Sequence, residues 1–130
     1  MKLVKHNKTV SALAYHLVFC PKYRRNILVD KIKTRAEEII RNACIEKHIN
    51  ILALNIQPDH VHMLVSALPK TSLDYIAKIV KGRTSNLLRS EFPDLLKMPS
   101  LWSRSYFACT VGQANEEVTK KYIEEQWKKR

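Results

Sequence analysis

The chain has 130 residues, of which 45% are hydrophobic, and its 23 Lys and Arg exceed its 12 Asp and Glu, giving a formal net charge of +11. This length fits a single domain over residues 1–130, and this apolar content excludes wholesale disorder. The excess of positive charge indicates an anionic partner, usually nucleic acid, and the alternative is a generically basic protein.

Cysteine usage and hydropathy narrow the class of protein further. The three cysteines lie far apart and form no CxxC pair, which argues against a cysteine metal site and suits a reducing cytosol. The apolar runs are too short for a membrane span, and the basic N-terminus lacks the apolar core of a signal peptide. We therefore expect a cytoplasmic protein that does not bind a membrane.

The first part of the chain predicts a strand, a helix and a second strand. Residues 9–20 are rich in β-formers, and Pro21 ends this strand because proline cannot donate to a sheet ladder. Residues 31–47 carry apolar side chains at helical spacing, and Asp30 is a reasonable N-cap. Residues 49–57 are apolar on both faces for much of their length, which favours a central strand.

Residues 60–68 predict a third strand, which a short turn at residues 58–59 joins to the second as a hairpin. Side chains alternate between the two faces of a strand. One face carries Val61, Met63, Val65 and Ala67, and the other carries His60, His62, Leu64 and Ser66. We expect helices to cover the apolar set and to leave the histidines on the open face of the sheet.

Two helices and one strand complete the predicted fold. Thr71 and Asp74 fit a capping pattern that opens a helix over residues 72–91. Residues 102–111 predict a fourth strand, and residues 116–128 predict a final helix. The order is that of an α+β, ferredoxin-like β-α-β-β-α-β fold: an antiparallel sheet with two helices on one face, and an added C-terminal helix.

His60 and His62 form the sharpest chemical pattern in the chain. Two residues apart on a strand, their Cα atoms lie about 6.5–7 Å apart and both imidazoles can bind one metal ion. Alone, this pattern more often marks two surface or hydrogen-bonded histidines. Tyr122 and Gln126 lie four residues apart on the last helix and therefore share a face. Tyr122 fits a nucleophile and Gln126 a neutral third ligand, although Tyr122 alone would more often be a packing residue.

The leading candidates for contacts to DNA phosphates form a basic turn after the first strand: Lys22, Tyr23, Arg24 and Arg25. Lys81 and Arg83 on the second helix are further candidates, and a solvated surface is the alternative for both groups. Trp102, Arg104 and Tyr106 share a strand face, where they either stack on bases or bury aromatic rings beneath the final helix.

The sequence does not identify a general base. Tyrosine has a reference pKa near 10, so its attack needs proton removal or metal assistance. Strand alternation points Asp59 to the face opposite the histidines, which favours a role in the turn. His16 is the other candidate, and a buried structural histidine is the favoured interpretation.

Several segments together resemble the single-tyrosine HUH transposases that mobilise the smallest bacterial insertion sequences, the two-hundred/six-hundred-five superfamily. The resemblance extends over nearly the whole chain. Its segments are YHLVFCPKYRR (15–25), PDHVHML (58–64), LVSALPK (64–70), IVKGRTSN (79–86), LWSRSYFACTVG (101–112) and YIEEQ (122–126).

The resemblance implies a prokaryotic, nucleoid-associated, homodimeric enzyme that cuts single-stranded DNA bearing hairpins near the ends of the element. It implies that Tyr122 forms a 5′-phosphotyrosine beside a metal ion held by His60, His62 and Gln126. The tyrosine helix commonly completes the partner subunit's site in this family. The implied metal is Mg²⁺, and Mn²⁺ suits mixed His and Gln ligation better. The alternatives are a non-catalytic module that binds single-stranded nucleic acid, and a domesticated HUH nickase that acts on genomic repeats.

Overall fold

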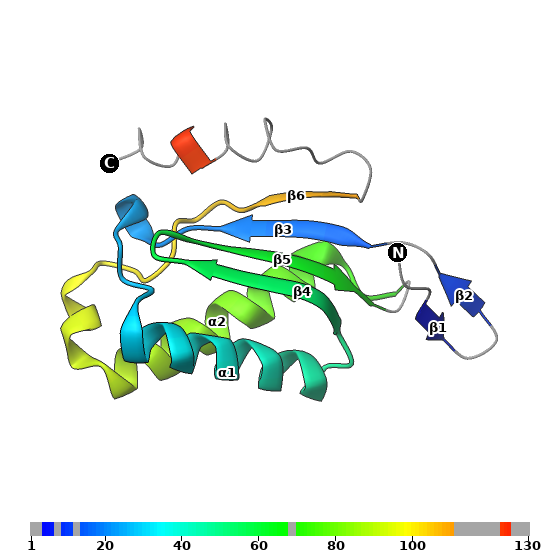
Figure 1. Cartoon of the computed structure of the whole chain (residues 1–130), viewed down its shortest axis with the longest axis horizontal. Helices are drawn as coiled ribbons and strands as arrows, with labels where there is room; N and C mark the ends of the chain where they lie inside the picture. The colour runs from blue at the N-terminus through cyan, green and yellow to red at the C-terminus, as the bar shows by residue number, and fades with distance from the viewer. Residues whose placement is uncertain (1–3, 7–8, 12–13, 68–69, 111–122, 126–130) are drawn as a thin grey trace.

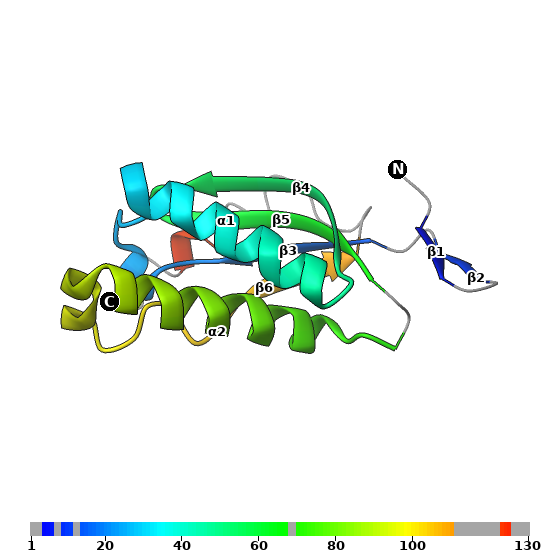
Figure 2. The same cartoon turned by 90° about the horizontal axis from the view of Figure 1, so that it is seen from below.

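The computed structural model describes residues 4–6, 9–11, 14–67, 70–110 and 123–125. Its main sheet has four antiparallel strands in the order β4-β5-β3-β6. These strands are β3 (Tyr15–Phe19), β4 (Asn50–Gln57), β5 (His60–Ser66) and β6 (Phe107–Thr110). The helices α1 (Asp30–Glu46) and α2 (Leu73–Glu91) lie side by side on one face of the sheet (Figures 1 and 2). The predicted ferredoxin-like order, with both helices on one face, is confirmed.

The alternation along β5 separates a buried face from an open one. Its apolar set, Val61, Met63 and Val65, is fully buried in the core that the sheet shares with both helices. His60 and His62 are half-buried on the opposite face. The predicted orientation of β5 is therefore confirmed, and the two imidazoles lie on the side of the sheet away from the helices.

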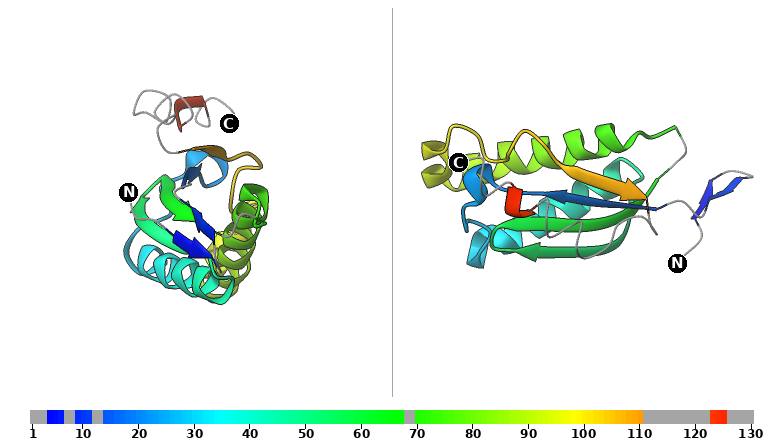
Figure 3. Two further views of the ribbon diagram at one scale, coloured as in Figure 1. Left: turned by 90° about the vertical axis from the view of Figure 1, so that its right-hand side faces the viewer. Right: turned by 90° about the horizontal axis from the view of Figure 1, so that it is seen from above.

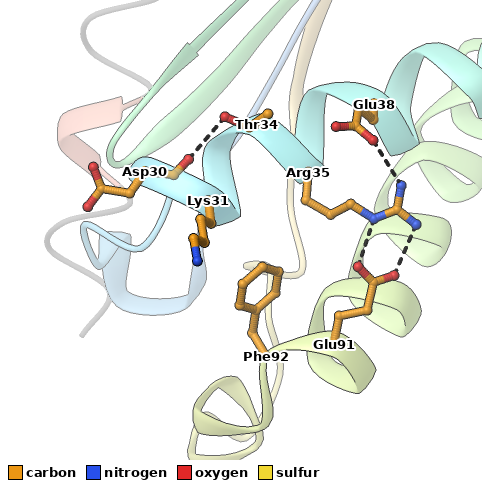
Figure 4. Close-up of a pocket in the computed structure, with 7 residues that line it drawn as sticks. All are labelled: Asp30, Lys31, Thr34, Arg35, Glu38, Glu91 and Phe92. Carbon is orange, nitrogen blue, oxygen red and sulfur yellow. Dashed lines mark hydrogen bonds and ion pairs between the residues drawn. The ribbon is translucent and has the colours of Figure 1, made fainter.

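Two ion pairs join α1 to α2. Arg35 donates from Nε and Nη2 to the Glu91 carboxylate at 2.7 and 3.0 Å (Figure 4). Toward the other end of α1, Arg83 donates from both Nη atoms to Glu46 at 2.8 Å each. Exposed pairs contribute little stability, but these two-pronged contacts set how the helices align along one another.

The first predicted strand is divided between two sheets. Thr9–Ser11 forms β2, which pairs with β1 (Val4–His6) as a separate two-stranded sheet. The strand of the main sheet begins only at Tyr15. The prediction of one strand over residues 9–20 is wrong because β-forming composition identifies extended residues without identifying the strand that pairs with them.

β4 is an edge strand of the main sheet, not a central one. Asn55 and Gln57 are exposed, so its two faces are not equally covered. The pairing with β5 shifts register between Ile51 and Ala53. This irregularity changes the side-chain alternation at Leu52, and it accounts for an apolar run that resembled a strand buried on both faces.

The helix caps differ from the predicted residues. α1 begins at Asp30, with Val29 as its N-cap and no side-chain capping hydrogen bond. The N-cap of α2 is Ser72, whose hydroxyl accepts the Tyr75 N–H at 3.0 Å, not Thr71. Capping patterns in a sequence often leave the first residue uncertain by one position.

In the described part of the chain, neither helix has the length and apolar composition needed to cross a membrane.

The fourth strand is shorter than predicted, because the regular pairing of β6 with β3 begins only at Phe107. Trp102 forms an isolated bridge with Pro21, and its ring contacts Phe19 edge-on at 4.7 Å between centroids. Its Nε1 donates to the Thr84 hydroxyl at 2.9 Å. Of the two uses considered for this tryptophan, burial is correct, but the ring is buried between β3 and α2.

We expect Ile40→Ala to lower the free energy of unfolding by about 2–5 kcal/mol, because the fully buried Ile40 would leave a cavity in the core. Ile45→Ala is the matched control, the same substitution in the same helix at a side chain that is 72% exposed. We expect this control to change stability by less than about 0.5 kcal/mol. Urea unfolding followed by circular dichroism measures both, and equal losses would contradict the position of the core.

Candidate active site

β5 holds His60 and His62 rigidly on the open face of the sheet. His60 is the first residue of the strand, and His62 lies between Val18 of β3 and Asn55 of β4 in the strand pairing. The His60 side chain is 20% exposed. Both imidazoles can therefore be reached from outside while the sheet restrains their backbone.

Asp59 contacts His60 directly. Its Oδ1 lies 2.9 Å from His60 Nδ1, and its Oδ2 accepts a hydrogen bond from Arg24 Nε. Burial raises the pKa of the Asp59 carboxyl, but the hydrogen bonds from Arg24 and His60 outweigh it and hold the pKa below its usual value. An ionised carboxylate at Nδ1 favours the tautomer that leaves Nε2 with a free lone pair.

This position of Asp59 contradicts the expectation from strand alternation. Asp59 belongs to the turn before β5, where the period of two that orients strand side chains does not apply. One feature of the sequence could have predicted this contact. Asp59 lies in a turn directly before the candidate ligand His60, and a turn allows its carboxylate to fold back onto the His60 ring.

His16 of β3 lies beside His62. Its Nδ1 is 2.8 Å from His62 Nε2, and the two ring centroids are 5.0 Å apart. Desolvation, followed by the charges of His16 and His60, lowers the pKa of His62 below 6.5. His62 is therefore neutral at neutral pH, which a metal ligand requires. His16 is half-buried rather than buried, and its contact with His62 agrees with the structural role favoured for it over that of a base.

His60 and His62 on β5 can supply two ligands to a divalent cation, but two ligands do not make a complete metal site. Within the ranges that the structure describes, no group of three His, Cys, Asp or Glu residues is arranged to hold a metal ion. Tyr122 and Gln126 lie outside the described residues, so their predicted roles remain predictions. Metal binding at Nε2 of His62 would replace its hydrogen bond with His16.

Part of the predicted final helix lies near this site. Ile123–Glu125 is helical and lies on the open side of the sheet, opposite α1 and α2 (Figures 1 and 3). Arg24 Nη1 donates to the Ile123 carbonyl at 3.4 Å. The residue that follows Tyr122 is therefore close to the turn that holds Asp59. The remainder of the helix predicted over residues 116–128 lies outside the described residues.

Two basic side chains of the turn after β3 lie close to the ring of Tyr23. Lys22–Arg24 forms the 3-10 turn η1, and Lys22 Nζ lies 5.3 Å from the centroid of the Tyr23 ring. The guanidinium carbon of Arg25 lies 5.8 Å from the same centroid. These are favourable cation–π distances. Two cations thus lie around Tyr23, whereas Arg24 faces Asp59.

The candidate DNA contacts on α2 have partners within the protein. The half-buried Lys81 donates from Nζ to the carbonyls of Ser103 at 2.7 Å and Arg104 at 3.3 Å. Desolvation lowers the pKa of Lys81. Arg83 is paired with Glu46 of α1, on the helical side of the sheet. Neither residue converges with His60, and their roles in DNA binding remain predictions.

Residues 9–126 match the family model described as transposase IS200 like. The chain is 30% identical to the ISDra2 transposase TnpA of Deinococcus radiodurans over 129 residues, which cover 97% of this chain and 92% of the relative. It is 34% identical to the transposase for insertion sequence element IS200 of Salmonella typhimurium over 115 residues, which cover 86% and 75%.

Two solved structures share the fold. A Deinococcus radiodurans protein assigned as a transposase superposes with a TM-score of 0.86 at 34% identity, over 97% of this chain and 98% of that one. A REP-associated tyrosine transposase bound to a REP hairpin superposes with a TM-score of 0.57 at 10% identity, over 95% of this chain and 69% of that one.

We expect the His62 ring to titrate with a midpoint below pH 6.5 in the metal-free protein. Because the folded pKa lies below the unfolded one, the stability that this group contributes above pH 6.5 is lost as the pH falls through the folded midpoint. His16→Gln should raise the midpoint, since it removes a neighbouring positive charge. NMR titration of the ring signals measures this, and a wild-type midpoint at or above 6.5 would contradict the burial of the ring.

Proposed function

Because the chain belongs to the IS200-like transposases, we propose that it cleaves and rejoins single-stranded DNA at the ends of an insertion sequence through a covalent tyrosine intermediate. Family membership makes it a DNA-binding transposase of a mobile element. The single-stranded form of the DNA substrate, the identity of the nucleophile and the metal are proposals that go beyond family membership. The observation that carries them is the pair of imidazoles on β5, one held by a carboxylate, close to the residue that follows Tyr122.

Tyr122 is the proposed nucleophile. Its phenolic oxygen attacks phosphorus, the bond from phosphorus to the 3′ oxygen breaks, and the DNA is left with a free 3′-hydroxyl and a 5′-phosphotyrosine. The new bond retains the energy of the phosphodiester. Another 3′-hydroxyl can therefore attack the phosphotyrosine and rejoin the strand without a nucleotide cofactor.

His60, His62 and Gln126 would hold Mg²⁺ or Mn²⁺, which when bound supplies positive charge to the scissile phosphate. Two imidazoles and an amide carry no negative charge, so these ligands leave that positive charge available to the DNA. Asp59 keeps the His60 ring in place. Lys22 and Arg25 lie where they can contact phosphates beside a base stacked on Tyr23.

We expect Tyr122→Phe to abolish cleavage and the covalent adduct while preserving DNA binding, because only the attacking oxygen is removed. The assay uses a labelled single-stranded hairpin with Mg²⁺ or Mn²⁺, a denaturing gel for the adduct and filter binding for affinity. His60→Ala and Gln126→Ala should abolish cleavage and spare much of the binding.

Tyr75→Phe is the matched control, since it removes an exposed phenol from α2. This control should cleave normally. An adduct formed by Tyr122→Phe would contradict the assignment of the nucleophile, and normal cleavage by His60→Ala would contradict the metal site.

We further propose that the protein acts as a homodimer on hairpin DNA in the cytoplasm, associated with the nucleoid, with Tyr122 and Gln126 of one subunit completing the histidine site of the other. The family resemblance supports this exchange, and a relative with the same fold was solved bound to a hairpin. One contact favours completion within a single chain instead: Arg24 and the Ile123 carbonyl belong to the same chain.

A mixture of His60→Ala and Tyr122→Phe subunits separates these two arrangements. If sites are completed by the partner subunit, a mixed dimer has one intact site, and we expect cleavage to recover although each variant alone is inactive. If sites are completed within one chain, each site carries a lesion and the mixture stays inactive. Native mass spectrometry of each sample confirms that mixed dimers have formed, because the mixed dimer and the two homodimers differ in mass.

The two alternative functions make different demands on metal and substrate. A non-catalytic nucleic-acid module needs no metal, so a lack of Mn²⁺ binding by the metal-free protein would favour it. A domesticated nickase keeps the chemistry and would cut dispersed genomic repeats, whereas subterminal palindromes beside the gene indicate a mobile element.

A further inference from the structure

The turns at Asp59 and at Lys22–Arg24 are linked by contacts that the cleavage reaction itself does not use. We propose that Asp59 and Arg24 are positioning residues: Asp59 orients His60, and Arg24 holds both Asp59 and the main chain beside Tyr122. This inference rests on the proposed roles of His60 and Tyr122 and on a site completed within one chain, the arrangement that the contact to Ile123 favours. It assigns Arg24 a task different from the phosphate contact expected of the basic turn.

Asp59 is bound on both sides. One carboxylate oxygen meets His60 Nδ1 at 2.9 Å, and the other accepts from Arg24 Nε. The side chains of Asp59, His60 and Arg24 are only 18%, 20% and 24% exposed, so these hydrogen bonds are partly shielded from water. An imidazole held in this way keeps one ring orientation and one tautomer, which leaves Nε2 as the nitrogen that can bind a ligand.

Arg24 extends the contacts to the C-terminal segment. Its Nε reaches Asp59 while its Nη1 reaches the Ile123 carbonyl at 3.4 Å. A planar guanidinium can hold two partners at fixed angles, which a lysine ammonium on a flexible stem cannot do. The strand that presents His60 and the main chain beside Tyr122 are thus joined through one side chain.

The backbone of the basic turn adopts a costly conformation around Arg24. Tyr23 and Arg24 have φ values of 59° and 53°, in the left-handed region that is unfavourable for a residue with a Cβ. The Arg24 N–H donates to the Pro21 carbonyl at 2.8 Å, and the Lys22 N–H donates to the Leu101 carbonyl at 2.9 Å. Strain of this kind persists where surrounding contacts enforce it, often at functional sites.

Arg24 and Arg25 differ in how much positive charge they offer to a DNA phosphate. The positive charge of Arg24 is compensated by the Asp59 carboxylate, whereas Arg25 is exposed. Arg25→Gln is therefore the comparison for a substitution of Arg24, because the two guanidinium groups come from adjacent positions in one turn.

The first test concerns Asp59 and uses the full-length, metal-free protein. Proton–nitrogen correlation spectra should show wild-type His60 with its proton on Nδ1, and Asp59→Ala should lose that preference. Titration with Mn²⁺ alone should show an affinity roughly 10–100-fold lower in Asp59→Ala, the usual effect of removing a carboxylate behind a metal-bound histidine. Asp59→Asn, whose amide oxygen can still accept a hydrogen bond, should restore part of both.

Asp94→Asn is the control for a general loss of charge, because Asp94 is 96% exposed in η2 (Pro93–Lys97). It should leave the tautomer and the Mn²⁺ affinity unchanged. A His60 tautomer and an Mn²⁺ affinity in Asp59→Ala equal to those of the wild type would overturn the role of Asp59.

The second test concerns Arg24. Arg24→Lys keeps the charge but loses the two-pronged contact, so it should bind hairpin DNA with wild-type salt dependence and form the adduct on the order of 10²-fold more slowly. Arg25→Gln should weaken binding and reduce the salt slope by about 1. Wild-type adduct formation by Arg24→Lys would overturn the inference, since charge alone would then be sufficient.

The wild-type protein separates failure of this inference from failure of the proposed function. If the wild type neither binds Mn²⁺ nor forms an adduct, the proposed function fails whatever the variants do. If the wild type does both and the Asp59 and Arg24 variants match it, only the positioning roles fail.

Discussion

The period-two alternation of β5 is the constraint on which the rest of the structure depends. The same seven-residue strand supplies three fully buried residues to the core and two imidazoles to the opposite face. A shift of one residue in its pairing would exchange these faces, burying His60 and His62 and exposing Val61 and Met63. The loss of burial makes that exchange unfavourable, so the core that stabilises the sheet also fixes the position of the candidate ligands.

Features that depend on side-chain periodicity could be predicted from the sequence. The open-face histidines, the two helices on the other face and the order of the main elements follow from the spacing of apolar residues. This spacing is every second residue in a strand and every three to four residues in a helix. Features that depend on pairing partners could not. Thr9–Ser11 pairs with the neighbouring segment Val4–His6, for which the sequence predicted no strand. β4 lies at an edge because the order of strands in the main sheet is set by contacts distant in the sequence.

The candidate site shows the same division. The positions of His60 and His62 follow from spacing along a strand, whereas the contacts of Asp59 depend on the conformation of a two-residue turn. The basic turn is a further example. Its sequence predicts positive charge but does not predict which way each basic side chain points. Its backbone turns Arg24 toward a carboxylate and leaves Lys22 and Arg25 around the Tyr23 ring. Net charge therefore indicates a nucleic-acid partner without indicating which cations meet it.

The division of the proposed ligands between two parts of the chain has a chemical consequence. Two imidazoles sit on a strand whose geometry the core enforces, while the proposed third ligand and nucleophile belong to a segment that contacts the first part through the Ile123 carbonyl. Two neutral ligands alone hold a divalent cation weakly, so metal binding and placement of the tyrosine would depend on the same docking. The site would then be complete only when the nucleophile is in place, which limits cleavage to the state in which this segment is docked.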